Sequence, residues 1–294
     1  MEHFRQFGDT GLKVSALGFG AANLGDPHIE DSHAEKMLNQ VLDLGINLID
    51  TARAYGLSEE RVGKFISHRR SEFVLSTKVG YGIEGQKDWT YNCVLSGVDH
   101  ALKLLKTDYI DIVHLHTCSE NLLRDGEVVS ALEKAKEIGK IKVLAYAGDN
   151  NAVQYALHSG RFGSLMTSIN LCDQRFLDRG LGESKEKRLG IIAKRPLANA
   201  PWRFAERPHG HYCEEYWHRL KTMNIDTQGL DWNEIALRFA AFTYGVDSCI
   251  VGTTNLEHLK DNLSGIQKGK LPQAMIDAIR TNFREHDFGW VQMT

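Results

Sequence analysis

The chain has 294 residues, of which 42% are hydrophobic and 25% are charged, and its formal net charge is −3 at pH 7. These values are ordinary for a globular protein, and the chain is long enough for one large buried core. No basic block is interleaved with aromatic residues, which argues against a nucleic-acid partner. No apolar run approaches the ~20 residues of a membrane-spanning helix, so no membrane partner is expected.

The five cysteines are scattered, odd in number and never spaced as a CxxC pair. This usage is typical of a reducing compartment. The N-terminal residues show no apolar segment of the kind found in secretory signals. We therefore expect a cytoplasmic protein with free thiols.

The predicted elements begin with a hairpin over residues 4–14, which turns at Gly8–Gly11. A strand over residues 15–20 follows. Later in the chain, Ser58 is expected to cap the start of a helix. Seven more strands are predicted at residues 47–50, 73–77, 109–115, 141–146, 164–171, 189–193 and 247–251. Further helices are predicted at residues 32–44, 92–105, 127–138, 152–157, 232–244, 256–266 and 273–284.

About eight strand–helix repeats in ~250 residues predict an α/β protein, specifically a (β/α)8 barrel. No linker divides the chain, so residues 1–294 are expected to form one domain. A doubly wound sheet is the alternative, but no GxGxxG motif follows the first strand. The long loop after the seventh strand, residues 196–231, is rich in aromatic side chains. We expect this loop to wall or cover the barrel mouth.

Four polar side chains fall at or just after three consecutive predicted strands. Asp50 ends the second strand, Tyr55 lies in the loop after it, and Lys78 and His116 end the third and fourth. In a barrel, the C-terminal ends of the strands converge on one mouth. The sequence therefore predicts that a carboxylate, a phenol, an ammonium and an imidazole meet there.

This combination suits proton transfer to a carbonyl oxygen. An isolated phenol has a pKa of ~10, and a neighbouring ammonium favours the phenolate form. A carboxylate beside the lysine keeps that lysine charged, so Tyr55 is expected to act as a general acid–base. His116 can hydrogen-bond the substrate oxygen. Because no protein side chain donates hydride, carbonyl reduction would require a nicotinamide cofactor.

These residues lie in segments that resemble the aldo-keto reductase superfamily. The segments 5–25, 45–63, 73–78 and 111–116 occur in the order expected for that family, and the similarity continues to about Asn262. The resemblance implies an NAD(P)H-dependent oxidoreductase that reduces a small-molecule aldehyde or ketone to an alcohol. It also implies that hydride comes from nicotinamide and the proton from Tyr55. It leaves the oligomeric state open, because members occur as monomers and as oligomers.

The segment 248–262 resembles the part of this family that binds the adenosine phosphate. It runs from a strand through Gly252 into a helix N-terminus, where free N–H groups and the helix dipole favour a phosphate. An ordinary capped helix start is the alternative interpretation. His258 is the only cation here for a 2′-phosphate, so the resemblance favours NADP(H) and leaves NAD(H) open. The residues that the resemblance assigns to this end are Gly252, Thr253, Thr254, His258 and Asn262.

The expected nicotinamide end departs from the family pattern. Ala147 and Gly148 replace a serine–asparagine pair, and Met166 replaces a glutamine, with Asn170 nearby. The usual aromatic residue after strand seven is missing. The remaining positions that the resemblance assigns to the cofactor are Gly20, Ala21, Asp50, Lys194, Arg195, Pro196 and Leu197. Lys194 or Arg195 is expected either to stack on the ring or pair with the pyrophosphate, or to be a plain surface cation.

Two other functions are compatible with parts of the sequence. His114 and His116 share one strand face and could bind zinc for hydrolysis, with Asp50 and Asp173 as candidate further ligands, although no metal is expected. A nucleotide-bound regulatory protein with slow turnover is the other alternative. Substrate specificity is expected from residues 80–89, the aromatic loop and residues 286–290, which form either a partly apolar pocket or packing at the rim.

Overall fold

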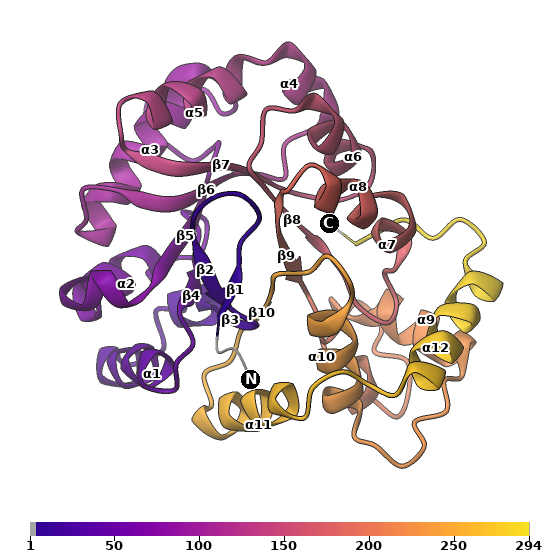
Figure 1. Ribbon diagram of the computed structural model, residues 1–294. Coiled ribbons are helices and arrows are strands. Elements are labelled where there is room, and N and C mark those ends of the chain that lie inside the picture. The colour runs from indigo at the N-terminus through magenta and orange to yellow at the C-terminus, as the bar shows by residue number, and fades with distance from the viewer. Residues whose placement is uncertain (1–3, 294) are drawn as a thin grey trace.

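The computed structural model describes residues 4–293, and its centre is a closed barrel of eight parallel strands (Figure 1). Neighbouring strands follow the order β10-β3-β4-β5-β6-β7-β8-β9, which confirms the predicted (β/α)8 barrel. The barrel strands are β3 (Leu17–Gly20), β4 (Leu48–Asp50), β5 (Val74–Val79), β6 (Ile110–His116), β7 (Ile141–Ala147), β8 (Ser164–Ser168), β9 (Gly190–Lys194) and β10 (Ser248–Val251).

The predicted N-terminal hairpin is present. Strands β1 (Phe4–Gln6) and β2 (Lys13–Ser15) pair antiparallel in a separate two-stranded sheet. Phe7, in the turn between them, is fully buried in one cluster with Leu48 and Val74, near the beginnings of β4 and β5. The hairpin thereby closes the N-terminal end of the barrel, which leaves the C-terminal end of the strands for a site.

Helices surround the strands in Figure 1. They are α1 (Asp31–Asp43), α2 (Ser58–Phe65), α3 (Tyr91–Leu105), α4 (Glu120–Asp125), α5 (Glu127–Glu137), α6 (Asn150–Ser159), α7 (Arg175–Arg179), α8 (Leu181–Glu186), α9 (Glu214–Met223), α10 (Trp232–Phe242), α11 (Leu256–Gln267) and α12 (Gln273–His286). Three 3-10 helices, η1 (Ala21–Gly25), η2 (Ser67–Glu72) and η3 (Pro201–Arg203), complete the set. The short helices α4, α7, α8 and α9 were not predicted. Within residues 4–293, no helix combines the length and apolar character that crossing a membrane requires.

The prediction that Ser58 caps α2 is wrong. Leu57 is the N-cap residue, and no side chain caps this helix. The Ser58 hydroxyl is buried instead, where it donates to the carbonyl oxygen of Ala21 (2.9 Å) and bonds the hydroxyl of Thr51 (2.7 Å). Because both partners lie at barrel strand ends, Ser58 ties the start of α2 to the barrel mouth.

The sixth barrel strand is shorter than predicted. It ends at Ser168, because the side-chain oxygen of Asn170 accepts the backbone N–H groups of Cys172 (2.8 Å) and Asp173 (2.9 Å) and turns the chain. Asn170 is fully buried in this turn.

The aromatic loop, residues 196–231, is more structured than expected. It contains η3 and α9, and side chains of α9 form a second hydrophobic cluster with α10 and α12. These three helices lie together in Figure 1. Much of this segment therefore packs beside the barrel, and the cavity is lined mainly by its first half, with Asp231 at its other end.

We expect Gly25→Ala to disturb the loop that carries Tyr55. A Cβ atom at Gly25 would lie 1.7 Å from the Tyr55 carbonyl oxygen, so the backbone must move. The predicted loss of unfolding free energy is about 2 kcal/mol, measured by urea denaturation. Gly182→Ala in α8 is the control, since its Cβ would meet nothing within 4 Å. Equal stability of the two variants would contradict this account.

Candidate active site

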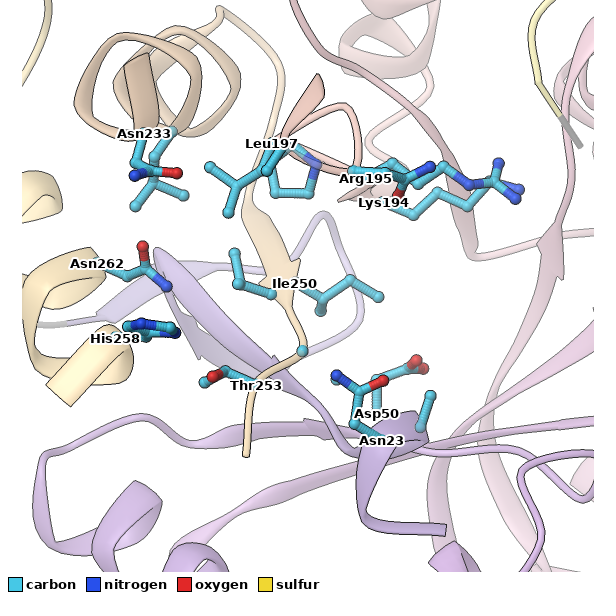
Figure 2. Close-up of a pocket in the computed structure, with 18 of the residues that line it drawn as sticks. Asn23, Asp50, Lys194, Arg195, Leu197, Asn233, Ile250, Thr253, His258 and Asn262 are labelled. Carbon is cyan, nitrogen blue, oxygen red and sulfur yellow. The ribbon is translucent and has the colours of Figure 1, made fainter. Parts of the chain in front are cut away.

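A large cavity opens at the C-terminal ends of the barrel strands, with a volume of about 1180 Å³ (Figure 2). Asp50, Lys194 and Arg195 lie at one end of it, and His258 and Asn262 lie at the other. Pockets for single small ligands are typically ~300–1,000 Å³. This cavity is therefore long and large enough for an extended ligand together with a smaller one.

The four predicted catalytic side chains all line this cavity. The ammonium of Lys78 donates to Asp50 Oδ2 (2.6 Å) and to the Thr51 carbonyl oxygen (2.8 Å). Its Nζ lies 4.8 Å from the ring centroid of Tyr55. The Tyr55 ring meets the His116 ring edge-on, with 5.8 Å between centroids. The structure thus brings the four together at one end of the cavity.

The Asp50–Lys78 ion pair is buried, with 2% and 3% of the two side chains exposed. Burial alone would lower the pKa of Lys78, but the charges of Asp50 and Tyr55 outweigh it and raise that pKa. Lys78 is therefore a permanent cation beside the Tyr55 phenol.

A second layer of hydrogen bonds holds Asp50 from behind. The Ser76 hydroxyl donates to Asp50 Oδ1 (2.8 Å), and His114 Nε2 lies 3.1 Å from the same hydroxyl oxygen. Burial, followed by the Lys78 charge, holds the pKa of His114 well below its ordinary value. Because the single hydroxyl proton of Ser76 goes to Asp50, the neutral His114 must donate to Ser76 from Nε2.

The structure does not favour the metal interpretation. The imidazole of His114 bonds Ser76, whereas that of His116 bonds Tyr81, so the two rings have separate partners. Residues 4–293 contain no group of three or more His, Cys, Asp or Glu side chains placed to hold a metal ion. Asp173, the other candidate ligand, bonds Tyr216 and Arg219 instead.

Lys194 and Arg195 line the cavity but are not plain surface cations. Lys194 Nζ lies 2.7 Å from Asp149 Oδ2, and Arg195 Nη1 lies 3.7 Å from it. The other Asp149 oxygen accepts the Thr167 hydroxyl (2.9 Å) and the Ser168 backbone N–H (2.8 Å). Sequence analysis missed Asp149. Its only sequence signal is its position just after the fifth barrel strand.

Of the other residues expected at the nicotinamide end, Ala147, Met166, Pro196 and Leu197 line the cavity. Gly148 does not line it, and its backbone lies against the Tyr146 ring, where a Cβ atom would come 2.3 Å from the hydroxyl. Asn170 is also outside, buried in the turn described above.

The far end of the cavity contains most of the residues expected to contact the adenosine phosphate. Gly252, Thr253, His258 and Asn262 line the cavity there, and Gly20, also assigned to the cofactor, lines it beside Asp50. Ala21 and Thr254 do not: the Ala21 carbonyl accepts Ser58, and the Thr254 carbonyl lies 2.7 Å from His33 Nε2.

Sequence analysis also missed residues that α10 and the end of α11 bring to this far end. Asn233 and Glu234 line the cavity, as does Lys268, whose Nζ lies 2.6 Å from Glu234 Oε2. Lys268 is a second cation on the cavity wall, at the C-terminal end of α11 and about 15 Å along the helix from His258. In the sequence, 34 positions separate it from its carboxylate partner. No local pattern could have placed it there.

The expected specificity segments have different roles. In the aromatic loop, Trp202 and Tyr212 line the cavity, whereas Tyr216 is fully buried. From the 80–89 loop, Tyr81 reaches His116. In the C-terminal tail, Trp290 packs against the ring of Phe283.

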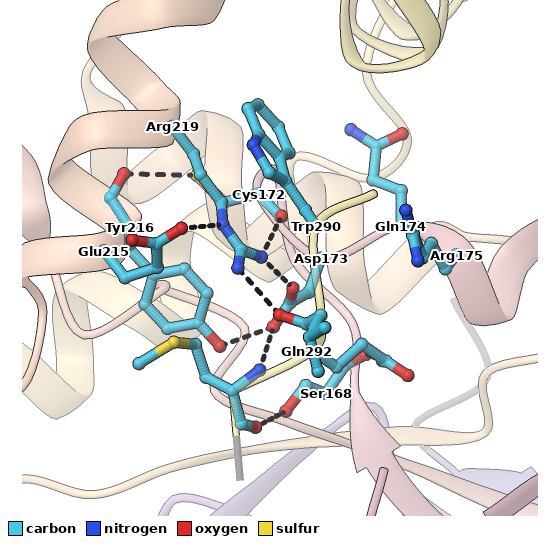
Figure 3. A network of polar contacts seen from close by, with 12 residues as sticks. Ser168, Cys172, Asp173, Gln174, Arg175, Glu215, Tyr216, Arg219, Trp290 and Gln292 are labelled. Carbon is cyan, nitrogen blue, oxygen red and sulfur yellow. Dashed lines mark hydrogen bonds and ion pairs between the residues drawn. The ribbon is translucent and has the colours of Figure 1, made fainter. Parts of the chain in front are cut away.

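Figure 3 shows how this tail is attached. The Asp173 carboxylate accepts the Tyr216 hydroxyl (2.6 Å) and an Arg219 N–H (2.7 Å), and Arg219 also donates to the Val291 carbonyl (2.7 Å). Two residues on, the Met293 carbonyl accepts an N–H of Arg195 at 2.6 Å. The tail therefore contacts a residue of the cavity wall.

Comparisons with known proteins agree with this geometry. The sequence profile described as "Aldo/keto reductase family" matches residues 16–282. The chain belongs to the aldo/keto reductase family. This confirms the resemblance in the sequence and establishes the chain as an oxidoreductase of this family. It also favours the oxidoreductase interpretation over a hydrolase or a regulatory protein.

Several aldo/keto reductase relatives are similar over most of their length. L-galactose dehydrogenase of Arabidopsis thaliana is 30% identical over 281 residues, which is 89% of this chain and 87% of that protein. D-threo-aldose 1-dehydrogenase of a Pseudomonas species is 27% identical, and the matched region spans 82% of this chain and 84% of that protein. The solved holo form of aldo-keto reductase AKR11C1 from Bacillus halodurans is 27% identical, with a TM-score of 0.84 and 95% of each chain covered.

We expect Asp149→Asn to destabilise the protein by about 3 kcal/mol, because it leaves the nearly buried Lys194 ammonium without its counter-charge. The asparagine can still accept from Thr167 and Ser168, so the effect isolates the charge. Urea denaturation measures it. Glu257→Gln, which removes an exposed partner of Lys260, is the control and should leave the midpoint unchanged. A negligible effect at Asp149 would contradict a structural role for this ion pair.

Proposed function

We propose that this aldo/keto reductase is NADP(H)-dependent and reduces an aldehyde or ketone to an alcohol, with Tyr55 as the proton donor. The observation that supports this most strongly is the buried Asp50–Lys78 ion pair beside the Tyr55 ring, at one end of a long cavity. A permanent cation next to a phenol stabilises the phenolate that proton donation leaves behind.

Each of the four side chains has a separate task in this proposal. His116 donates a hydrogen bond to the carbonyl oxygen and orients it. Tyr55 gives its hydroxyl proton to the same oxygen as the carbonyl carbon is reduced. The charge of Lys78 stabilises the resulting phenolate, and Asp50 holds Lys78 in place. Solvent returns the proton to Tyr55 before the next turnover. Burial first, followed by the Lys78 and Lys194 charges, lowers the pKa of His116 to about 3, so His116 stays neutral at physiological pH.

The cavity residues fit a nicotinamide dinucleotide. Gly20 and Gly252 let two backbone segments approach closely, since a Cβ at Gly252 would lie 3.1 Å from the Gly20 carbonyl oxygen. Next to them the N-terminus of α11, capped by Asn255, favours a phosphate. When bound, the reduced nicotinamide supplies the hydride. Lys194 and Arg195 would hold the nicotinamide or the pyrophosphate, and Thr253, His258 and Asn262 would hold the adenosine phosphate.

The choice of NADP(H) rests on the charges at the far end of the cavity. His258 alone is a weak, pH-dependent cation. Lys268 adds a permanent ammonium to the same wall. Its partner Glu234 also pairs with Arg238 (2.6 Å), so Glu234 keeps a counter-charge when Lys268 turns to a ligand. A 2′-phosphate would complete this arrangement.

The substrate is proposed to be a small carbonyl compound with polar groups. The cavity wall supplied by the aromatic loop combines Trp202 and Tyr212 with the basic side chains of Arg203 and His211. Two relatives are named as dehydrogenases of L-galactose and of D-threo-aldoses. Aldoses are therefore the first substrates to test, in both directions, beside apolar aldehydes.

Replacing Tyr55 with Phe should lower kcat for carbonyl reduction by roughly a hundredfold or more, because the general acid is removed. The ring remains, so NADPH affinity, followed by nucleotide fluorescence, should not change. Steady-state NADPH oxidation with a panel of aldoses and aldehydes provides the rate. Full activity of the variant would refute the assigned proton donor. If the unmodified protein bound neither NADPH nor NADH, the proposed function itself would fail.

Replacing Lys268 with Ala should weaken NADPH binding about tenfold, the loss expected for one hydrogen bond to a charged group. NADH binding should be unaffected, because NADH lacks the 2′-phosphate. The matched control is Lys260→Ala, since Lys260 lies in α11, outside the cavity, and pairs with Glu257. Titrations of all three proteins with both nucleotides at one salt concentration test this. Equal weakening for NADH and NADPH, or tighter NADH binding by the unmodified protein, would contradict the NADP(H) assignment.

A further inference from the structure

The protonation of the two His116 ring nitrogens decides what this residue can do. A neutral imidazole donates a hydrogen bond from one nitrogen and accepts at the other. His116 can donate to a substrate oxygen only if the nitrogen that faces the cavity carries the proton. The surrounding residues must therefore select one of the two tautomers.

Tyr81 occupies one of these nitrogens. Its hydroxyl oxygen lies 3.0 Å from His116 Nδ1, and the two rings are stacked with 5.6 Å between centroids and 23° between planes. The other nitrogen, Nε2, has no hydrogen-bond partner within residues 4–293 and is not among the buried atoms that lack a partner. Since His116 lines the cavity, Nε2 is the nitrogen accessible from it.

The proton between the two rings belongs to Tyr81. Partial burial, followed by the nearby Tyr55, raises the pKa of Tyr81, so its hydroxyl stays protonated. His116 is neutral, as its low pKa requires. A phenol is a stronger acid than the N–H of a neutral imidazole, so the hydroxyl is the better donor. Within residues 4–293 it has no other partner to donate to.

The loop that carries Tyr81 is clamped on both sides. The Trp89 backbone N–H donates to the Gly80 carbonyl (2.7 Å), and the Trp89 ring packs on Tyr81 with 5.4 Å between centroids. The Gly82 N–H donates to Asp88 Oδ1 (2.9 Å), and its carbonyl accepts Arg53 Nε (2.8 Å). Tyr81 is therefore held over His116 by several independent contacts.

We propose that Tyr81 is a positioning residue that fixes His116 in the tautomer with the proton on Nε2. Tyr81 donates to Nδ1, which leaves Nε2–H as the donor that faces the cavity. The identity of the acceptor, a substrate carbonyl oxygen, rests on the proposed function. The tautomer itself does not, because it follows from contacts within the chain.

The test uses Tyr81→Phe, which keeps the ring that stacks on His116 and Trp89 and removes only the hydroxyl. Nitrogen-15 NMR of the imidazole groups at neutral pH, assigned with a His116→Gln sample, reports which ring nitrogen carries the proton. We expect Nε2–H and a hydrogen-bonded Nδ1 in the unmodified protein. In the variant, the Nδ1 resonance should move toward that of an unbonded nitrogen. A proton on Nδ1 in the unmodified protein, or an Nδ1 resonance unchanged by the substitution, would overturn the inference.

Kinetics separate this inference from the proposed function. Tyr81→Phe should lower kcat about tenfold, less than the loss of a whole oxyanion donor, while the NADPH dissociation constant stays the same. Tyr244→Phe is the matched control, because Tyr244 is 76% exposed and far from these contacts in the chain. An unchanged kcat in the Tyr81 variant would overturn its positioning role. An unmodified protein that reduces no carbonyl compound would refute the proposed function, and the NMR result would still decide the tautomer.

Discussion

The site depends on one interaction, the buried ion pair between Asp50 and Lys78. Removing two charges from water is costly, and such a pair persists only where further hydrogen bonds satisfy it. Here the Thr51 carbonyl accepts a second proton of Lys78, and the Ser76 hydroxyl satisfies the second oxygen of Asp50. The barrel supplies these partners because parallel strands end side by side. With these acceptors satisfied, the remaining neighbour on which the Lys78 charge acts is the Tyr55 ring.

A second buried carboxylate, Asp149, holds cations in place at the opposite wall. It lies behind Lys194 and Arg195, so the charges that reach the cavity there are positive and the negative charge is hidden. In both ion pairs, a nearly or fully buried carboxylate holds a cation at the surface of the cavity. This distribution of charge suits an anionic ligand bound together with a carbonyl compound. The neutral His116 between the two walls adds a hydrogen-bond donor without adding charge.

Strand–helix periodicity was sufficient to predict the barrel, the hairpin and the strand ends of Asp50, Lys78 and His116, because these depend on local pattern. Other features depend on contacts between distant segments. Ser58 has the residue type of a helix cap, but burial between Ala21 and Thr51 gives its hydroxyl other partners. Lys268 and Tyr81 carry no motif, and their contacts depend on how helices and loops pack above the strands. The catalytic and cofactor roles stay predictions, since no observation here tests them.

The attachment of the C-terminal tail has a consequence for how such a barrel can diversify. The Met293 carbonyl contacts Arg195, and Asp173 and Arg219 secure the residues just before it, so the tail supports the cavity wall at Arg195 from behind without lining the cavity itself. Changes in the sequence of the tail would remodel the surface around Arg195 and leave the four residues at the other wall untouched. Ligand preference and chemistry can therefore vary independently in this architecture, since separate segments of the chain encode them.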